Sequence, residues 1–159
     1  MSIKTADLCD EFDDQIQVAQ PLFLDYGGRI MFQGPIHTLK IFEDNSLVRS
    51  TLEQPGQSKV LVIDGGASMR CALVGGNLAV LAAKNGWAGI IVNGCIRDSE
   101  EIAAQPVGVK ALATNPRKSV KKGVGDDNIT VRFADVTFSP NHYVYADEDG
   151  IVVAEQALT

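Results

Sequence analysis

Residues 59–94, KVLVIDGGASMRCALVGGNLAVLAAKNGWAGIIVNG, are the stretch that decides the fold. The run KVLVID, residues 59–64, is short, apolar and followed by two glycines, which is the pattern of a buried strand entering a tight turn. The segment GGNLAVLAAKNG, residues 75–86, has helical periodicity and ends in an Asn-Gly stop signal. The run AGIIVNG, residues 88–94, predicts the next buried strand. This order of elements predicts a right-handed crossover on a partly parallel sheet.

The flanking sequence extends this pattern to a mixed α/β fold with more strand than helix. Three further helices are predicted, in residues 5–12 with Thr5 as N-cap, in residues 45–56 with Asn45 as N-cap, and in residues 99–105 with Ser99 as N-cap. Strands are predicted in the β-branched and aromatic segments 107–116, 128–138 and 142–156. At 159 residues and without internal repeats, the chain is expected to form a single domain over residues 1–159.

The charge and cysteine content exclude several classes of function. The chain has 20 acidic and 14 basic residues, so its net charge of −6 repels nucleic acid and anionic membranes. The basic segment RKSVKKG, residues 117–123, lacks interleaved aromatic residues and is interpreted as a solvated loop. No apolar run approaches the ~20 residues of a membrane span. Three cysteines that are far apart in sequence and form no C-x-x-C indicate reduced thiols, so we expect a cytoplasmic protein.

Three segments are candidates for a ligand site, because ligands of α/β sheets collect outside the carboxyl ends of the strands. They are the Gly65-Gly66 turn, the segment GGNL at residues 75–78, and the pair Arg97-Asp98. At GGNL, the unpaired backbone N–H groups of Gly76, Asn77 and Leu78 could hold a carboxylate at the positive end of a helix. The alternative is that the two glycines only form a turn.

Arg97 and Asp98 have complementary chemistry for an anionic substrate. A guanidinium binds a carboxylate through two hydrogen bonds, and a carboxylate is a hard ligand suited to Mg²⁺ or Mn²⁺. The alternative is an ion pair at the end of a strand, or Asp98 acting as a helix cap. Sequence spacing alone favours the ion pair or the helix cap, but it does not exclude a metal and substrate site.

The ordered motifs LCDEF, GGR, FEDNSLV, KVLVIDGG, GNLAVLAAKNGWAGIIVNGCIRD and YADEDGIVV resemble the family of regulators of ribonuclease activity A, which also includes 4-hydroxy-4-methyl-2-oxoglutarate aldolase-like proteins. The resemblance covers nearly the whole chain. It implies a swivelling β/β/α, phosphohistidine-domain-like fold and a homotrimer or hexamer. It also implies one of two functions: a divalent-metal-dependent aldolase that also decarboxylates oxaloacetate, or a protein that binds and inhibits ribonuclease E.

The resemblance also assigns roles to the candidate residues. It implies that Gly75, Gly76, Asn77 and Leu78 contact a 2-oxo acid through their backbone, that Arg97 is a catalytic, substrate-contacting residue, and that Asp98 holds Mg²⁺ or Mn²⁺. The aldolase motif has an aspartate where this chain has Gly76. Weakened proton transfer is therefore expected, and Gly76→Asp is expected to raise decarboxylation. A menaquinone methyltransferase activity, sometimes assigned to the family, is not supported, because the chain lacks a glycine-rich nucleoside-binding turn.

Overall fold

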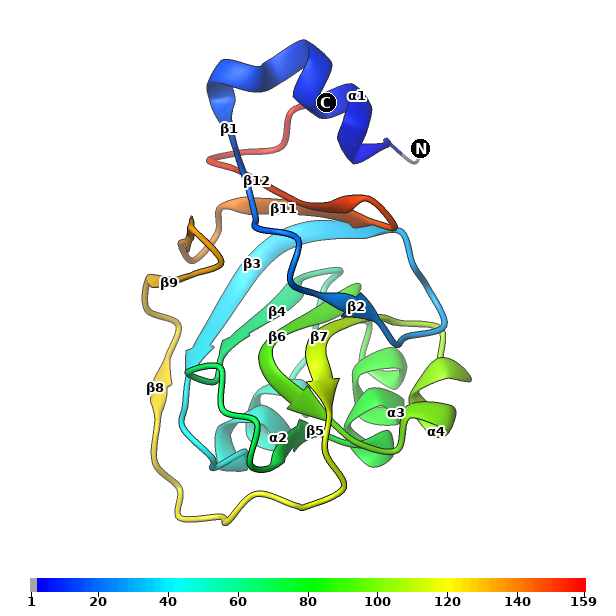
Figure 1. The fold of residues 1–159 in the computed structure, drawn as a ribbon, viewed down its shortest axis with the longest axis vertical. Helices are drawn as coiled ribbons and strands as arrows, with labels where there is room; N and C mark the ends of the chain where they lie inside the picture. Colours follow the sequence, from blue (N-terminus) through cyan, green and yellow to red (C-terminus); the bar gives the residue numbers. More distant parts are fainter. Residues whose placement is uncertain (1–2) are drawn as a thin grey trace.

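The computed structural model describes residues 3–159 and consists of a large mixed sheet with short helices (Figure 1). The helices are α1 (Thr5–Phe12), the 3-10 helix η1 (Asp13–Gln15), α2 (Ser46–Leu52), α3 (Gly76–Lys84) and α4 (Ser99–Ala103). The strands are β1 (Ile16–Val18), β2 (Leu24–Asp25), β3 (Phe32–Lys40), β4 (Val60–Asp64), β5 (Ala72–Val74), β6 (Gly89–Ile96), β7 (Gly108–Thr114), β8 (Asp126–Asp127), β9 (Val131–Phe133), β10 (Val136–Phe138), β11 (Tyr143–Asp147) and β12 (Gly150–Ala154).

The main sheet has the order β1-β12-β11-β3-β4-β6-β7-β2, with β5 paired to β6 and β8 paired to β3. Its centre, β3-β4-β6-β7, is parallel, whereas β11 and β12 are antiparallel to their neighbours. The predicted mixed α/β sheet with a parallel crossover through α3 is therefore confirmed. Both faces of β4 and β6 are covered, so every residue in these mainly apolar strands is buried, including the polar Asp64 and Asn93.

Two apolar cores lie on the two faces of the sheet. On one face, α2, α3 and α4 cover β4, β6 and β7, where Leu61, Ile63 and Ile90 are fully buried (Figure 1). The other face packs against β11, β12 and the separate β9-β10 hairpin, with Phe138 at its centre. Helix α1 lies at the far end of the molecule, where Leu8 packs on strands β11 and β12.

Several local predictions differ from the structure. Thr5 is the first residue of α1 instead of its cap, because its backbone N–H and its hydroxyl both donate to the buried carboxylate of Asp147, over 2.8 and 2.7 Å. The N-cap of α4 is Asp98 and not Ser99. Strand β5, within a segment to which the sequence analysis gave no strand, pairs with β6. Among the helices of residues 3–159, none is both long and apolar enough to cross a bilayer.

Candidate active site

The parallel pairing of β5 with β6 brings the two predicted site segments together. Ala72 on β5 lies opposite Cys95 on β6, so the carboxyl ends of both strands reach the same edge of the sheet. Strand β5 leads into the GGNL segment and α3, while β6 leads into Arg97-Asp98 and α4. The backbone N–H of Arg97 donates to the carbonyl of Val74 over 2.9 Å and fixes the two segments side by side. The site therefore depends on a strand that the sequence analysis missed.

The two segments line one cavity of about 140 Å³. Its lining combines GGNL and Arg97-Asp98 with side chains from α2 and from the basic loop: Asn45, Arg49, Ala72, Gly75, Gly76, Asn77, Leu78, Arg97, Asp98, Lys118, Ser119 and Lys121. Four of these side chains are cationic and one is a carboxylate, so the cavity is basic in a chain of net charge −6. Of the Gly65-Gly66 turn, the third predicted segment, Gly66 lines a different hollow beside Phe42 and Gly125.

The two alternative roles predicted for Asp98 were an ion pair at the strand end and a cap of the helix that follows. Among the residues that it describes, the structure shows neither of these two contacts. The backbone of Asp98 is left-handed, with φ 59° and ψ 43°, and its side chain makes no capping bond to α4. Within residues 3–159 it forms no ion pair with Arg97, whose Nη1 donates instead to the Pro116 carbonyl over 3.4 Å. Asp98 Oδ2 accepts the backbone N–H of Gly76 over 2.9 Å. The carboxylate therefore caps the neighbouring helix α3 and lies at the cavity.

The N-terminus of α3 offers fewer free amides than the sequence suggested. The N–H of Gly76 is bonded to Asp98, and the first intrahelical bond runs from the N–H of Ala79 to the carbonyl of Gly75. Within the described chain, the N–H groups of Asn77 and Leu78 have no acceptor. Two adjacent backbone donors at a helix N-terminus can bind one carboxylate oxygen each.

Glu101 is a site residue that the sequence analysis did not identify. A Cβ added at Gly76 would overlap Oε2 of Glu101, and a Cβ added at Gly75 would come within 2.9 Å of Oδ2 of Asp98. The two glycines therefore let two carboxylates lie against the turn that opens α3. The available signal was a second carboxylate three residues after Asp98, in the first turn of α4. The carboxylate of Glu101 thus fills the space that a side chain at position 76 would occupy.

The basic loop, residues 117–123, is exposed as predicted except at the buried Ser119, and hydrogen bonds also fix it to the fold. The hydroxyl of Ser119 donates to Oδ1 of Asn45 over 2.8 Å and accepts the N–H of the same residue over 3.2 Å. Oδ2 of the buried Asp44 accepts the backbone N–H groups of Lys122 and Val124, over 2.9 and 3.0 Å. These bonds present the Lys118 and Lys121 side chains to the cavity.

Asp44 makes the attachment of this loop dependent on pH. Burial alone would raise the pKa of Asp44, but hydrogen bonds from Ser46, Val124 and Lys122 outweigh burial and hold the pKa far below its usual value. A carboxylate whose pKa is lower in the folded state stabilises that state above the unfolded value of about 4. The stabilisation is lost as the pH falls from about 4 through the folded pKa.

Replacing Asp44 with Asn is expected to lower the free energy of unfolding at pH 7 by about 2 kcal/mol, because the charged acceptor of two backbone amides is lost. The difference between variant and parent should shrink below pH 4. Thermal unfolding across pH 3–7 measures this, and hydrogen exchange should show faster exchange at Lys122 and Val124. Asp10→Asn, at an exposed position of α1, is the control. Equal stability of Asp44→Asn and the parent at pH 7 would contradict this role.

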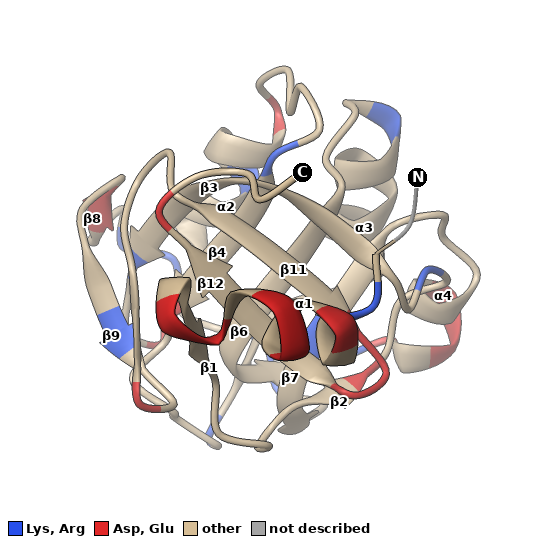
Figure 2. Ribbon diagram, turned by 90° about the horizontal axis from the view of Figure 1, so that it is seen from above, with Lys and Arg blue, Asp and Glu red and all other residues tan. Residues whose placement is uncertain are grey.

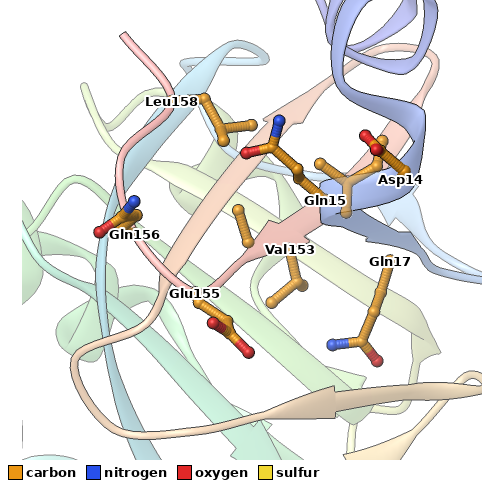
Figure 3. A pocket seen from close by; sticks show the side chains of 9 residues that line it. Asp14, Gln15, Gln17, Val153, Glu155, Gln156 and Leu158 are labelled. Carbon is orange, nitrogen blue, oxygen red and sulfur yellow. The ribbon is translucent and has the colours of Figure 1, made fainter.

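A second cavity, of about 360 Å³, lies between η1-β1 and the C-terminal residues (Figure 3). Its lining includes the carboxylates of Asp14 and Glu155 and the amides of Gln15, Gln17 and Gln156. It has no cationic side chain among its described lining residues. The cavity at Arg97-Asp98 is therefore better suited to an anionic substrate than this second cavity.

The donor set at this cavity fits Mg²⁺ or Mn²⁺. Residues 3–159 contain no group of three His, Cys, Asp or Glu side chains that could enclose a metal ion. Mg²⁺ commonly binds through one or two carboxylates and takes its other ligands from water and substrate. Asp98 and Glu101 supply two oxygen donors against the same turn, and within residues 3–159 Oδ1 of Asp98 accepts no hydrogen bond.

A family model described as RraA-like, Aldolase/RraA, matches residues 5–153. The chain belongs to the RraA-like family. Relatives named as 4-hydroxy-4-methyl-2-oxoglutarate aldolases include one from Alkalilimnicola ehrlichii, 58% identical over 99% of this chain and 98% of the relative. Another, from Aromatoleum aromaticum, is 60% identical over 99% of both chains.

Solved structures confirm the RraA-like fold. The RNA-processing inhibitor RraA from Thermus thermophilus is 42% identical and superposes with a TM-score of 0.96, over 100% of this chain and 96% of that chain. A Geobacillus kaustophilus protein titled S-adenosylmethionine:2-dimethylmenaquinone methyltransferase is 52% identical, with a TM-score of 0.96 over 98% of this chain and 97% of that chain. Proteins of this one fold thus carry three different functional names.

Proposed function

We propose that this RraA-like protein is a divalent-metal-dependent lyase that cleaves 4-hydroxy-4-methyl-2-oxoglutarate into two molecules of pyruvate and also decarboxylates oxaloacetate. The observation that carries the proposal is the cavity in which Arg97, Asp98 and the N-terminus of α3 meet. It is supported by identities of 58 and 60% to relatives named as such aldolases. Both reactions break the C3–C4 bond of a 2-oxo acid and leave its electron pair in a pyruvate enolate.

The residues of the cavity divide into metal-holding and substrate-orienting groups. Asp98, with Glu101 beside it, would hold Mg²⁺ or Mn²⁺, and a bound metal ion supplies Lewis-acid stabilisation of the charge that develops on the keto oxygen. Arg97 adds a positive charge at the same edge of the cavity. The free N–H groups of Asn77 and Leu78 orient one substrate carboxylate at the positive end of α3.

Glu101 is also the group placed to move a proton. Aldol cleavage requires a base for the C4 hydroxyl proton, and the resulting enolate requires a proton at C3. Oε2 of Glu101 lies against the turn that holds Asn77 and Leu78, in the space where the aldolase motif has an aspartate side chain. The proposal therefore assigns to Glu101 the role that the aldolase motif gives to an aspartate at position 76.

The direct test is to follow pyruvate release from 4-hydroxy-4-methyl-2-oxoglutarate and from oxaloacetate by the purified protein. Release should require Mg²⁺ or Mn²⁺ and should stop when EDTA is added. Oxaloacetate also decarboxylates in metal solutions alone, so the rate without protein is subtracted. An absence of metal-dependent release from both substrates would reject the proposed function.

A second candidate function is binding and inhibition of ribonuclease E, favoured by the likeness to the Thermus RraA structure and by the charge of one surface. Helix α1 and η1 carry five exposed carboxylates at one end of the molecule (Figure 2), on Asp7, Asp10, Glu11, Asp13 and Asp14. Such a surface can receive a basic, disordered segment in a salt-sensitive manner. Retention by the non-catalytic region of the ribonuclease at low salt, lost when these residues are replaced by Ser, would support this function. Failure to bind at low salt would reject it.

A further inference from the structure

The cavity has more cationic side chains than are needed to bind one 2-oxo acid group beside a metal ion. Arg97 lies next to Asp98, where the reacting 2-oxo acid group would bind. Three further cations, Arg49, Lys118 and Lys121, line the same cavity from α2 and from the basic loop. Among the cavity-lining residues, Asp98 is the single carboxylate, so these three cations have no acidic partner in the lining. An anion other than the 2-oxo acid group would complement them.

The backbone segments that carry these three cations are fixed by the fold. Lys118 pairs through its backbone with Ala72, and Ser119, next in the chain, is bonded to Asn45 at the start of α2. Asn45 also donates to the carbonyl of Leu73 over 3.1 Å, so the basic loop, α2 and β5 are tied together. Arg49 lies on α2, whose N-terminus is fixed by the bonds from Ser46 to Asp44. These bonds fix the backbone positions from which the three cationic side chains reach the cavity.

We propose that Arg49, Lys118 and Lys121 form a subsite for the second carboxylate of a dicarboxylic 2-oxo acid. The inference rests on the proposed function and adds a group that selects dicarboxylic over monocarboxylic substrates. It also reduces the carboxylate-binding amides of α3 from the three that the sequence predicts to two. With Gly76 bonded to Asp98, the Asn77 and Leu78 amides serve one carboxylate, and the basic loop serves the other.

The subsite affects the two reactions differently. In the cleavage of 4-hydroxy-4-methyl-2-oxoglutarate, the C4 hydroxyl loses its proton, the C3–C4 bond breaks towards C3, and the second carboxylate stays on the departing pyruvate. Its contacts to the cations persist through the transition state. In oxaloacetate decarboxylation the second carboxylate itself leaves as neutral CO₂, so its charge disappears in the transition state. Contacts that stabilise the substrate more than the transition state raise affinity without raising the rate.

The test compares Arg49→Met, Lys118→Met and Lys121→Met with the matched control Lys122→Met, an exposed residue of the same loop that does not line the cavity. Each of the three variants should lower kcat/KM for 4-hydroxy-4-methyl-2-oxoglutarate by about tenfold to a hundredfold, the effect of one charge-assisted contact. For oxaloacetate, KM should rise while kcat stays level or increases. For the monocarboxylic 4-hydroxy-2-oxopentanoate, kcat/KM should change less than twofold.

Competitive inhibition reports the binding of ligands that are not themselves cleaved. The inhibition constant of 2-oxoglutarate, which has both carboxylates but no C4 hydroxyl, should rise in the three variants, whereas that of pyruvate should not. Equal losses for monocarboxylic and dicarboxylic ligands, or an effect of Lys122→Met as large as that of Lys121→Met, would overturn the subsite while leaving the lyase intact. A parent protein that is inactive on every substrate would overturn both proposals.

Discussion

Asp98→Asn is expected to lower metal-dependent cleavage of oxaloacetate and of 4-hydroxy-4-methyl-2-oxoglutarate by about a thousandfold, the scale expected when Lewis-acid stabilisation is lost. Asn is the appropriate replacement because position 98 is left-handed, a conformation that Asn tolerates as well as Asp. The Asn side-chain oxygen can still accept the N–H of Gly76, so the turn before α3 is retained. What is lost is the charge that would hold the metal ion.

The matched control is Asp135→Asn, which changes another exposed aspartate of left-handed backbone, with φ 63°, in the turn between β9 and β10. It should keep full activity. Steady-state rates over a range of Mg²⁺ concentrations, with thermal unfolding to confirm the fold, separate loss of metal binding from loss of structure. Equal activity of Asp98→Asn and Asp135→Asn would remove Asp98 from the mechanism.

Glu101→Ala should lower kcat for both substrates by about a hundredfold, the usual range for removal of an acid–base group. The physical reason is the position of its carboxylate, which fills the space beside Gly76. Glu100→Ala is the matched control, because Glu100 is the adjacent exposed carboxylate in the first turn of α4. Stopped assays of pyruvate release give the rates. A Glu101→Ala enzyme as active as Glu100→Ala would show that this carboxylate has no catalytic role.

The same geometry changes the expected effect of Gly76→Asp. In the parent protein a side chain at position 76 must displace Glu101 and adds a third negative charge near Asp98, so no gain in decarboxylation is expected. In the Glu101→Ala background the space is empty, and Gly76→Asp should recover about tenfold of the lost rate. A higher decarboxylation rate of Gly76→Asp in the parent, with no recovery in the Glu101→Ala background, would contradict the idea that Glu101 takes the role of an aspartate at position 76.

The central sheet could be predicted because its sequence signals are local. The apolar runs of β4 and β6 and the Asn-Gly stop after α3 correspond to single elements, and a parallel pair of strands joined by a helix has one preferred hand. Of the three segments that the strand-end rule predicts at one edge, GGNL and Arg97-Asp98 meet at one cavity, whereas Gly66 lines another hollow. Strand β5, with three residues, gave too short a signal, although it is the element that places the two segments in contact.

The remaining parts of the site depend on long-range contacts. Nothing local in RKSVKKG indicates that Ser119 bonds to Asn45, 74 residues away in sequence, or that Asp44 binds the backbone of Lys122. The sequence therefore predicts the exposure of the loop but not its attachment to the cavity. The position of Glu101 beside Gly76 could not be predicted either, because a glycine gives no indication of which side chain fills the space next to it. Glu101 and the three extra cations are visible only once α2, α3, α4 and the basic loop are in place.

The central claim is that this cavity forms a pyruvate enolate with the help of a divalent metal ion held at Asp98. Exchange of the methyl hydrogens of pyruvate for deuterium in D₂O, followed by proton NMR, tests the claim without assuming the physiological substrate. We predict exchange that requires Mg²⁺ or Mn²⁺, that stops with EDTA, and that is lost in Asp98→Asn but kept in Asp135→Asn. Exchange no faster than in protein-free Mg²⁺ solution, or exchange at the parental rate in Asp98→Asn, would contradict it.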